Sequence, residues 1–204
     1  MIAKHCKISR RTEPQALHLP LLKKQGSTVV TVRDKDFEIY LSEKEIQTAI
    51  RGLAAQVNAD YAGLNPLFIG VLNGAFMFFS DLMKHIQGDC TVGFVKASSY
   101  EGMETSGKVA FQAMDGLIIE GRHVIVVEDI IDTGNTLKAL YQQLGKQQPK
   151  SLRVCTLLFK KEAYKQSLPI DYVCFETENK FLLGYGLDYD GLGRNLPEVY
   201  ILKN

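Results

Sequence analysis

The first part of the chain that shows a regular pattern of apolar and polar positions predicts a hairpin followed by a helix. The mostly apolar segments 29–32 (VVTV) and 37–40 (FEIY) flank the polar stretch 33–36, as in two strands joined by a tight turn. Ser42 and Glu45 then have the spacing of a helix capping box, and apolar residues recur every three or four positions after them. This apolar face is expected to lie in the core.

Apolar runs and helical patterns alternate along the rest of the chain. Strands are predicted at 67–72, 90–97, 123–129 and 151–159, helices at about 75–86 and about 136–144, and short strands and turns from Tyr172 onward. Strands separated by helices usually pair in parallel, so this order predicts an α/β fold with a mostly parallel central sheet flanked by helices. The polar stretch 99–108, with two glycines, predicts a long mobile loop between strands.

Length and composition favour one domain that acts on small molecules. The chain has 204 residues, and we expect residues 29–204 to form one domain behind a poorly ordered extension at 1–28. The extension is basic, so a targeting peptide is an alternative. Lys and Arg total 24 against 23 for Asp and Glu, which gives no reason to expect a nucleic-acid partner.

The cysteines and the hydropathy pattern indicate a cytoplasmic protein. Four cysteines lie far apart, without metal-ligand spacing, and are interpreted as reduced thiols: Cys6, Cys90, Cys155 and Cys174. No apolar run approaches the roughly 20 residues that span a bilayer, so no membrane partner is expected.

The candidate chemistry is concentrated in the string Val126–Thr136, VVEDIIDTGNT, which joins a predicted buried strand to a helix. In open α/β sheets ligands bind at the carboxyl ends of strands, and a turn rich in Gly and Thr before a helix presents N–H groups to an anion. The turn from Asp132 is therefore interpreted as a phosphate site. The adjacent carboxylates Glu128 and Asp129 suit hydroxyl groups or a hydrated Mg²⁺.

A structural explanation exists for each piece alone. The paired acids could be a solvated strand end, and Asp132-Thr133-Gly134 could be an ordinary helix cap. The complete order of apolar strand, paired acids, second apolar pair and polar turn favours a site for a sugar phosphate and magnesium.

The string resembles the phosphoribosyl pyrophosphate motif of type I phosphoribosyltransferases, in the form found in hypoxanthine-guanine phosphoribosyltransferases. The resemblance runs from about Val29 to the C-terminus. It implies the type I fold, in which a small hood built from the two ends of the chain accompanies the central sheet. It also implies transfer of phosphoribosyl from its pyrophosphate donor to N9 of a 6-oxopurine in purine salvage, Mg²⁺ as cofactor, and a homodimer or homotetramer.

Two further segments resemble motifs of the family and occur in the same order along the chain. Leu72, Asn73 and Gly74 resemble its pyrophosphate loop, which often has a cis peptide after the Leu; alone they would suggest an ordinary turn. Many members have Lys in place of Asn73, so the backbone role carries over but the charge does not. Ser99 and Tyr100 resemble the start of the family's catalytic lid, which would exclude water from a hydrolysable donor.

The resemblance also assigns a purine pocket. Lys160 matches the lysine that contacts the exocyclic oxygen at purine position 6, although the neighbouring Lys161 leaves the register open by one residue. Phe181 would stack on the base, and backbone groups around Leu182 would bind its edge.

The remaining assignments complete the site that the resemblance implies. Asp132 would act as general base at purine N7, Ile130 would pack against the base, and Glu128 and Asp129 would hold the ribose hydroxyls and metal. Asp188 would lie near a second metal and pyrophosphate, and Arg194 would contact pyrophosphate. The 5-phosphate would be bound by Thr133, Gly134, Asn135 and Thr136.

Two other functions fit parts of the pattern. One is a non-catalytic regulator that senses the donor and binds RNA or DNA; the near-neutral charge and the retained purine pocket speak against it. The other is a phosphoribosyltransferase for another base. Lys160 disfavours adenine because an ammonium group repels an amino group, but hypoxanthine, guanine and xanthine are not ranked.

Overall fold

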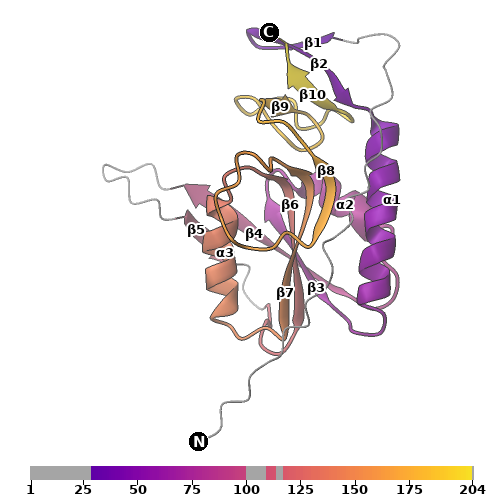
Figure 1. Ribbon diagram of the computed structural model, residues 1–204, viewed down its shortest axis with the longest axis vertical. Coiled ribbons are helices and arrows are strands. Elements are labelled where there is room, and N and C mark those ends of the chain that lie inside the picture. The colour runs from indigo at the N-terminus through magenta and orange to yellow at the C-terminus, as the bar shows by residue number, and fades with distance from the viewer. Residues whose placement is uncertain (1–28, 100–108, 114–116, 204) are drawn as a thin grey trace, which may run out of the picture.

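The computed structural model describes residues 29–99, 109–113 and 117–203, arranged in two sheets and three helices (Figure 1). The predicted extension at 1–28 and Tyr100 lie outside these residues. In chain order the elements are β1 (Val29–Val32), β2 (Lys35–Leu41), α1 (Glu43–Asp60), β3 (Leu67–Leu72), α2 (Phe76–Met83), β4 (Thr91–Ser99), β5 (Val109–Ala113), β6 (His123–Ile131), α3 (Asn135–Gly145), β7 (Ser151–Phe159), β8 (Tyr172–Glu176), β9 (Leu182–Leu183) and β10 (Val199–Leu202).

The larger sheet has the strand order β5-β4-β3-β6-β7-β8. Five of these strands, β4, β3, β6, β7 and β8, are parallel. Strand β5 pairs antiparallel with β4 at the edge of the sheet. Helices α1 and α2 pack on one face and α3 on the other, so the central strands are apolar on both sides. Residues 124–127 of β6 are completely buried. The predicted α/β fold is confirmed.

The smaller sheet joins the two ends of the described chain. It is antiparallel in the order β1-β2-β10-β9, around a small core of Phe37, Leu183 and Tyr200. The chain leaves β8 at its carboxyl end and enters β9 six residues later, so this sheet lies beyond the carboxyl ends of the parallel strands (Figure 1). It is the hood expected for the type I phosphoribosyltransferase fold.

The predicted capping box is present at the start of α1. The Ser42 side chain accepts from the Glu45 N–H, and the Glu45 carboxylate accepts from the Ser42 N–H at 2.8 Å. Two otherwise unpaired N–H groups are thereby satisfied at the helix end that faces the hood. Among the described residues, no helix has the length and apolar character needed to cross a bilayer.

Helix α2 ends at Met83, three residues earlier than the predicted boundary at Ile86. The side chain of Asn58 on α1 donates to the His85 carbonyl at 2.9 Å and accepts from the Gln87 N–H at 2.9 Å. These backbone groups are therefore satisfied from another helix, and the chain turns instead of continuing α2.

Two strands extend beyond their predicted ends. Strand β6 continues to Ile131 because Ile130 and Ile131 stay in register with Leu158 and Phe159 of β7, and β4 continues to Ser99. The paired acids, Glu128 and Asp129, therefore lie within β6, and Asp129 is two residues before the carboxyl end of this strand.

Candidate functional site

The turn between β6 and α3 has the geometry of an anion site. Gly134 precedes the helix with φ of 78°, a left-handed conformation that favours glycine. No side chain of the described residues forms a capping hydrogen bond at this helix end. The first N–H groups of α3 and the positive end of its dipole are thus available to a phosphate. Thr133, Asn135 and Thr136, the other residues predicted to bind the phosphate, adjoin Gly134 in this turn and in the first turn of α3.

The segment after β7 supports this turn from behind, and sequence reasoning missed it. A Cβ on Gly134 would overlap the ring of Tyr164. The Lys165 N–H donates to the Thr133 carbonyl at 3.2 Å, and the Gln166 side chain donates to Asn135 Oδ1 at 2.9 Å. These contacts fix the turn's conformation. They join positions about thirty residues apart and leave no local pattern in the sequence.

Glu128 and Asp129 are neighbouring acidic residues, the first buried and the second half-buried. Glu128 is 6% exposed, and burial raises its pKa well above the usual range, with a further increase from the charge of Asp129. Burial also raises the pKa of Asp129, although the Ile130 N–H opposes this by donating to its carboxylate. A divalent cation or several hydroxyl donors would relieve this repulsion, so the pair fits Mg²⁺.

A complete protein-made metal cage is absent. Within the described part of the chain, no group of three or more His, Cys, Asp or Glu side chains is arranged to hold a metal ion. Mg²⁺ commonly binds through one or two carboxylates together with water and substrate oxygens, so two carboxylates suit a metal that arrives with its substrate.

The loop after β3 lies directly against this pair. The peptide bond between Leu72 and Asn73 is cis, the form that the resemblance implies. A Cβ on Gly74 would overlap the carboxylate of Asp129, so only glycine fits the present backbone. The Asn73 side chain is exposed. The structure therefore brings the predicted pyrophosphate loop and the paired acids together.

Lys160 faces the site and Lys161 does not. Lys160 follows β7 and is 8% exposed, and its Nζ lies 2.8 Å from Oδ2 of Asp132 in the turn after β6. The side chain of Lys161 is 68% exposed and pairs with Glu176 instead. A buried ammonium group and a carboxylate thus lie side by side at the carboxyl ends of two neighbouring strands.

The hood segment contributes a second ion pair. Arg194 Nη2 lies 2.5 Å from Asp188 Oδ1, and Arg194 Nη1 donates to the Gly186 carbonyl at 2.7 Å. Asp188 also accepts from the Gly191 N–H at 2.8 Å. A Cβ on Gly186 would overlap the carbonyl oxygen of Gly74, so this segment packs against the loop after β3.

Phe181 presents an aromatic surface at the start of β9. Its side chain is 42% exposed, and its ring centroid lies 6.1 Å from that of Phe37 and 5.7 Å from that of Tyr189. Lys35 Nζ lies 4.7 Å from the centroid of the Tyr189 ring. Leu182 points into the main core, so any contribution to a ligand would come from its backbone.

Two predicted residues stand apart from these contacts. Ile130 is half-buried and packs against the main core, one residue after the paired acids. Ser99 ends β4 at the same edge of the sheet. The described contacts therefore bring together the turn after β6, Lys160, the loop after β3 and the segment 184–194.

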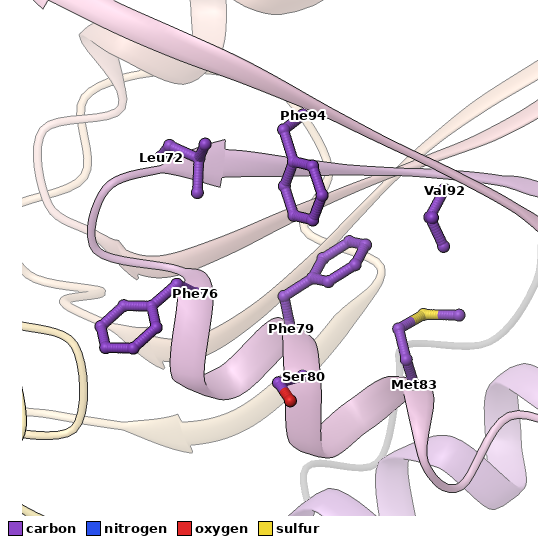
Figure 2. A pocket seen from close by; sticks show the side chains of 7 residues that line it. All are labelled: Leu72, Phe76, Phe79, Ser80, Met83, Val92 and Phe94. Atoms are coloured by element: carbon purple, nitrogen blue, oxygen red, sulfur yellow. The ribbon is translucent and has the colours of Figure 1, made fainter.

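An apolar groove lies on the outer side of the loop after β3 (Figure 2). It has a volume of about 390 Å³ and lies between α2 and strands β3 and β4. Its lining consists of Leu72, Phe76, Phe79, Ser80, Met83, Val92 and Phe94. Since none of these side chains is charged, the groove does not suit a phosphate, and we separate it from the candidate site.

Comparisons with known proteins agree with the geometry. The phosphoribosyl transferase domain family matches residues 37–190. A hypoxanthine-guanine phosphoribosyltransferase of Aquifex aeolicus is 39% identical over 175 residues, which are 85% of this chain and 98% of the relative. A hypoxanthine-guanine-xanthine phosphoribosyltransferase of Tritrichomonas foetus is 43% identical over 168 residues, 81% of this chain and 91% of the relative.

A solved structure shows the same fold. The crystal structure of a hypoxanthine-guanine phosphoribosyltransferase from Bacillus anthracis matches with a TM-score of 0.76 at 40% identity, covering 81% of this chain and 96% of that one. The similarity therefore extends over nearly the whole length of each relative.

Proposed function

Because the chain belongs to the phosphoribosyltransferase family, we propose that it transfers the 5-phosphoribosyl group from phosphoribosyl pyrophosphate to N9 of a 6-oxopurine. Hypoxanthine and guanine are the proposed acceptors, giving IMP or GMP and pyrophosphate in purine salvage. Residues 29–204 would form the transferase domain, with 1–28 as an extension.

The pairing of Lys160 with Asp132 is the observation that carries this proposal. A 6-oxopurine presents an oxygen acceptor at position 6 beside N7 on one edge of the ring. An ammonium donor next to a carboxylate acceptor complements this edge, and a 6-aminopurine would place its amino group against the ammonium. The relatives reported above are named as transferases, which does not favour a non-catalytic regulator.

Asp132 would act as the general base. As the bond from ribose C1 to pyrophosphate breaks, pyrophosphate leaves with the electron pair and N9 bonds to C1. The purine then gives up a proton, which Asp132 would accept at N7. Lys160 would hold the oxygen at position 6, and Phe181 would cover one face of the base while Ile130 packs against it.

The other residues would bind the donor. Thr133, Gly134, Asn135 and Thr136 would hold the 5-phosphate through the N–H groups of α3. The backbone of Leu72, Asn73 and Gly74 would contact pyrophosphate together with Arg194, and Ser99 and Tyr100 would begin the lid.

Glu128, Asp129 and Asp188 are the residues that would hold Mg²⁺. When bound, the metal neutralises charge that develops on the departing pyrophosphate. Glu128 and Asp129 would also orient the ribose hydroxyls, since the Asp129 carboxylate lies against Gly74 of the loop that we assign to pyrophosphate.

The direct test is magnesium-dependent conversion of four bases to their monophosphates with phosphoribosyl pyrophosphate as donor. We expect turnover of hypoxanthine and guanine and none of adenine. Xanthine is included because one relative is named for it. No turnover of any base, with the donor still bound, would reject the enzyme and favour a sensor of the donor.

We also propose that the protein is a homodimer or homotetramer. The apolar groove, in which Phe76 and Val92 are both exposed, is a surface that a second copy would cover. Light scattering of the purified chain measures the mass, and Phe76→Glu should lower it if this surface is the contact. A monomer at all concentrations would reject the proposal.

A cytoplasmic location is the last part of the proposal. The three cysteines that the structure describes, Cys90, Cys155 and Cys174, are free thiols, as a reducing compartment maintains them. Cell fractionation measures the location directly, and recovery of the protein in a secreted or membrane fraction would contradict it.

A further inference from the structure

Tyr185 anchors the hood segment in the body of the molecule. It is 1% exposed, and its side chain belongs to the main core that α1 and α2 form, whereas neighbouring Leu183 belongs to the hood core. Its hydroxyl donates to Asp81 on α2 at 2.6 Å. The bond joins positions 104 residues apart in the chain.

Asp81 is a charged acceptor with three donors. It accepts from Tyr185, from Gln47 on α1 at 2.5 Å and from Lys84 at 2.7 Å. Burial alone would raise the pKa of Asp81, but the hydrogen bonds from Lys84, Tyr185 and Gln47 lower it overall. The bond from Tyr185 is therefore charge-assisted, which makes it stronger than a bond between neutral groups.

The two ends of this bond carry the two halves of the proposed pyrophosphate site. Helix α2, which carries Asp81, begins two residues after Gly74. Tyr185 is followed directly by Gly186, whose backbone packs on the Gly74 carbonyl and whose own carbonyl accepts from Arg194. Asp188 lies two residues further on and pairs with Arg194. Movement of Tyr185 away from Asp81 would thus separate the loop from the segment.

We propose that Tyr185 and Asp81 form a positioning pair, which fixes the distance between the loop 72–74 and the segment that carries Asp188 and Arg194. The pair would hold both surfaces in place around the pyrophosphate group. This inference rests on the proposed function, because it assigns a common ligand to the two surfaces. Neither residue is a catalytic residue, since each acts through the backbone that it holds.

A matched variant separates positioning from simple stability. Tyr172, 4% exposed, donates to the exposed Asp60 at 2.8 Å and forms a second bond from a buried tyrosine to an aspartate, near the amino ends of the strands. Tyr185→Phe and Tyr172→Phe each remove one hydroxyl and keep the ring. Both should lower the unfolding midpoint to a similar extent.

Steady-state kinetics is the deciding measurement. Tyr185→Phe should raise the KM for phosphoribosyl pyrophosphate roughly 3- to 10-fold, the factor that corresponds to the net free energy of one hydrogen bond. The KM for hypoxanthine should stay within about twofold of wild type. Tyr172→Phe should leave both constants unchanged. Asp81→Asn keeps an acceptor oxygen for Tyr185 and should lie between wild type and Tyr185→Phe.

Equal kinetic effects of Tyr185→Phe and Tyr172→Phe, or unchanged constants in Tyr185→Phe, would overturn the inference. If wild type turns over no base, the proposed function fails, and hydrogen exchange then tests the positioning pair by itself. Faster exchange of the amides at 73–76 and 186–188 in Tyr185→Phe, but not in Tyr172→Phe, would support the pair. Unchanged exchange in both would reject it.

Discussion

The two ends of the parallel sheet use similar side chains for different purposes. Near the amino ends of β7 and β8, each carboxylate faces a donor: Asp171 accepts from the Val154 N–H at 2.9 Å and pairs with Arg153, and Asp60 accepts from Tyr172. At the carboxyl ends, Glu128 is buried next to the half-buried Asp129, whose charge adds to the cost of burying Glu128.

The difference between the two ends indicates which carboxylates stabilise the fold and which could bind a ligand. A carboxylate that meets its donors is compatible with folding, whereas a buried carboxylate beside a second negative charge, as at Glu128, is costly until a ligand neutralises it. The carboxyl end also has the glycines that neighbouring groups leave no room to replace, at Gly74, Gly134 and Gly186. We therefore expect substitutions at the carboxyl end to affect turnover and ligand affinity, and substitutions at the amino end to affect stability alone.

The largest effect should come from Asp132→Asn. The side chain is half-exposed and Asn keeps an acceptor oxygen for Lys160, so the fold should be retained, while turnover of hypoxanthine should fall roughly 10²-fold or more because the proposed general base is lost. The measurement is kcat at saturating donor and base. Unchanged turnover would remove the proposed role and weaken the contrast between the two ends.

Lys160→Met should have the next largest effect. It removes a charge-assisted hydrogen bond to the base, so the KM for hypoxanthine should rise about 10- to 100-fold. Lys161→Met is the matched control, because that side chain is exposed and pairs with Glu176; it should behave as wild type. Equal effects of the two variants would contradict the assignment of Lys160.

Gly134→Ala should raise the dissociation constant of phosphoribosyl pyrophosphate about tenfold. The added Cβ would overlap Tyr164, and φ of 78° strains any residue that has a Cβ, at a cost of about 1–3 kcal/mol. Gly121→Ala is the control, since Gly121 has φ of 69° but no atom within 4 Å of an added Cβ. Calorimetric titration with the donor should show weaker binding only for Gly134→Ala.

The smallest effect concerns stability alone, at the amino end of β6. Burial lowers the pKa of His123, with further contributions from the charges of Lys150 and Arg153. The unfolded chain therefore binds a proton more readily, so stability should be lost as the pH falls below about 6.5. The urea midpoint of wild type should fall more than that of His123→Gln between pH 7 and pH 5.5. Equal falls in the two proteins would rule out this contribution.

The sequence predicted much of the fold because its patterns are local. The capping box of Ser42 and Glu45 and the apolar runs of the parallel strands each occupy a few consecutive residues, and all appear in the structure. The end of α2 was predicted wrongly because it depends on Asn58, a residue of another helix.

The candidate site could be predicted where its residues are consecutive in the chain, and not where it depends on long-range contacts. The string from Val126 to Thr136 is continuous, so its residues could be assigned together. The register of Lys160 and Lys161 stayed open in the sequence because alternation at a strand end is ambiguous. The supports at Tyr164 and at Tyr185 could not be found, because long-range contacts leave no pattern in the sequence.

The two ion pairs of the site, Lys160 with Asp132 and Arg194 with Asp188, should also affect which anions can bind there. Each cation already has a partner, so an anion that binds Lys160 or Arg194 must replace a carboxylate, whereas one that binds the N–H groups at the start of α3 meets no such competitor. A small ion such as inorganic phosphate offers few contacts in exchange for a broken pair. The proposed donor would reach the turn, the loop and the hood segment together and offers many contacts, so we expect the paired cations to favour large anionic ligands over small anions.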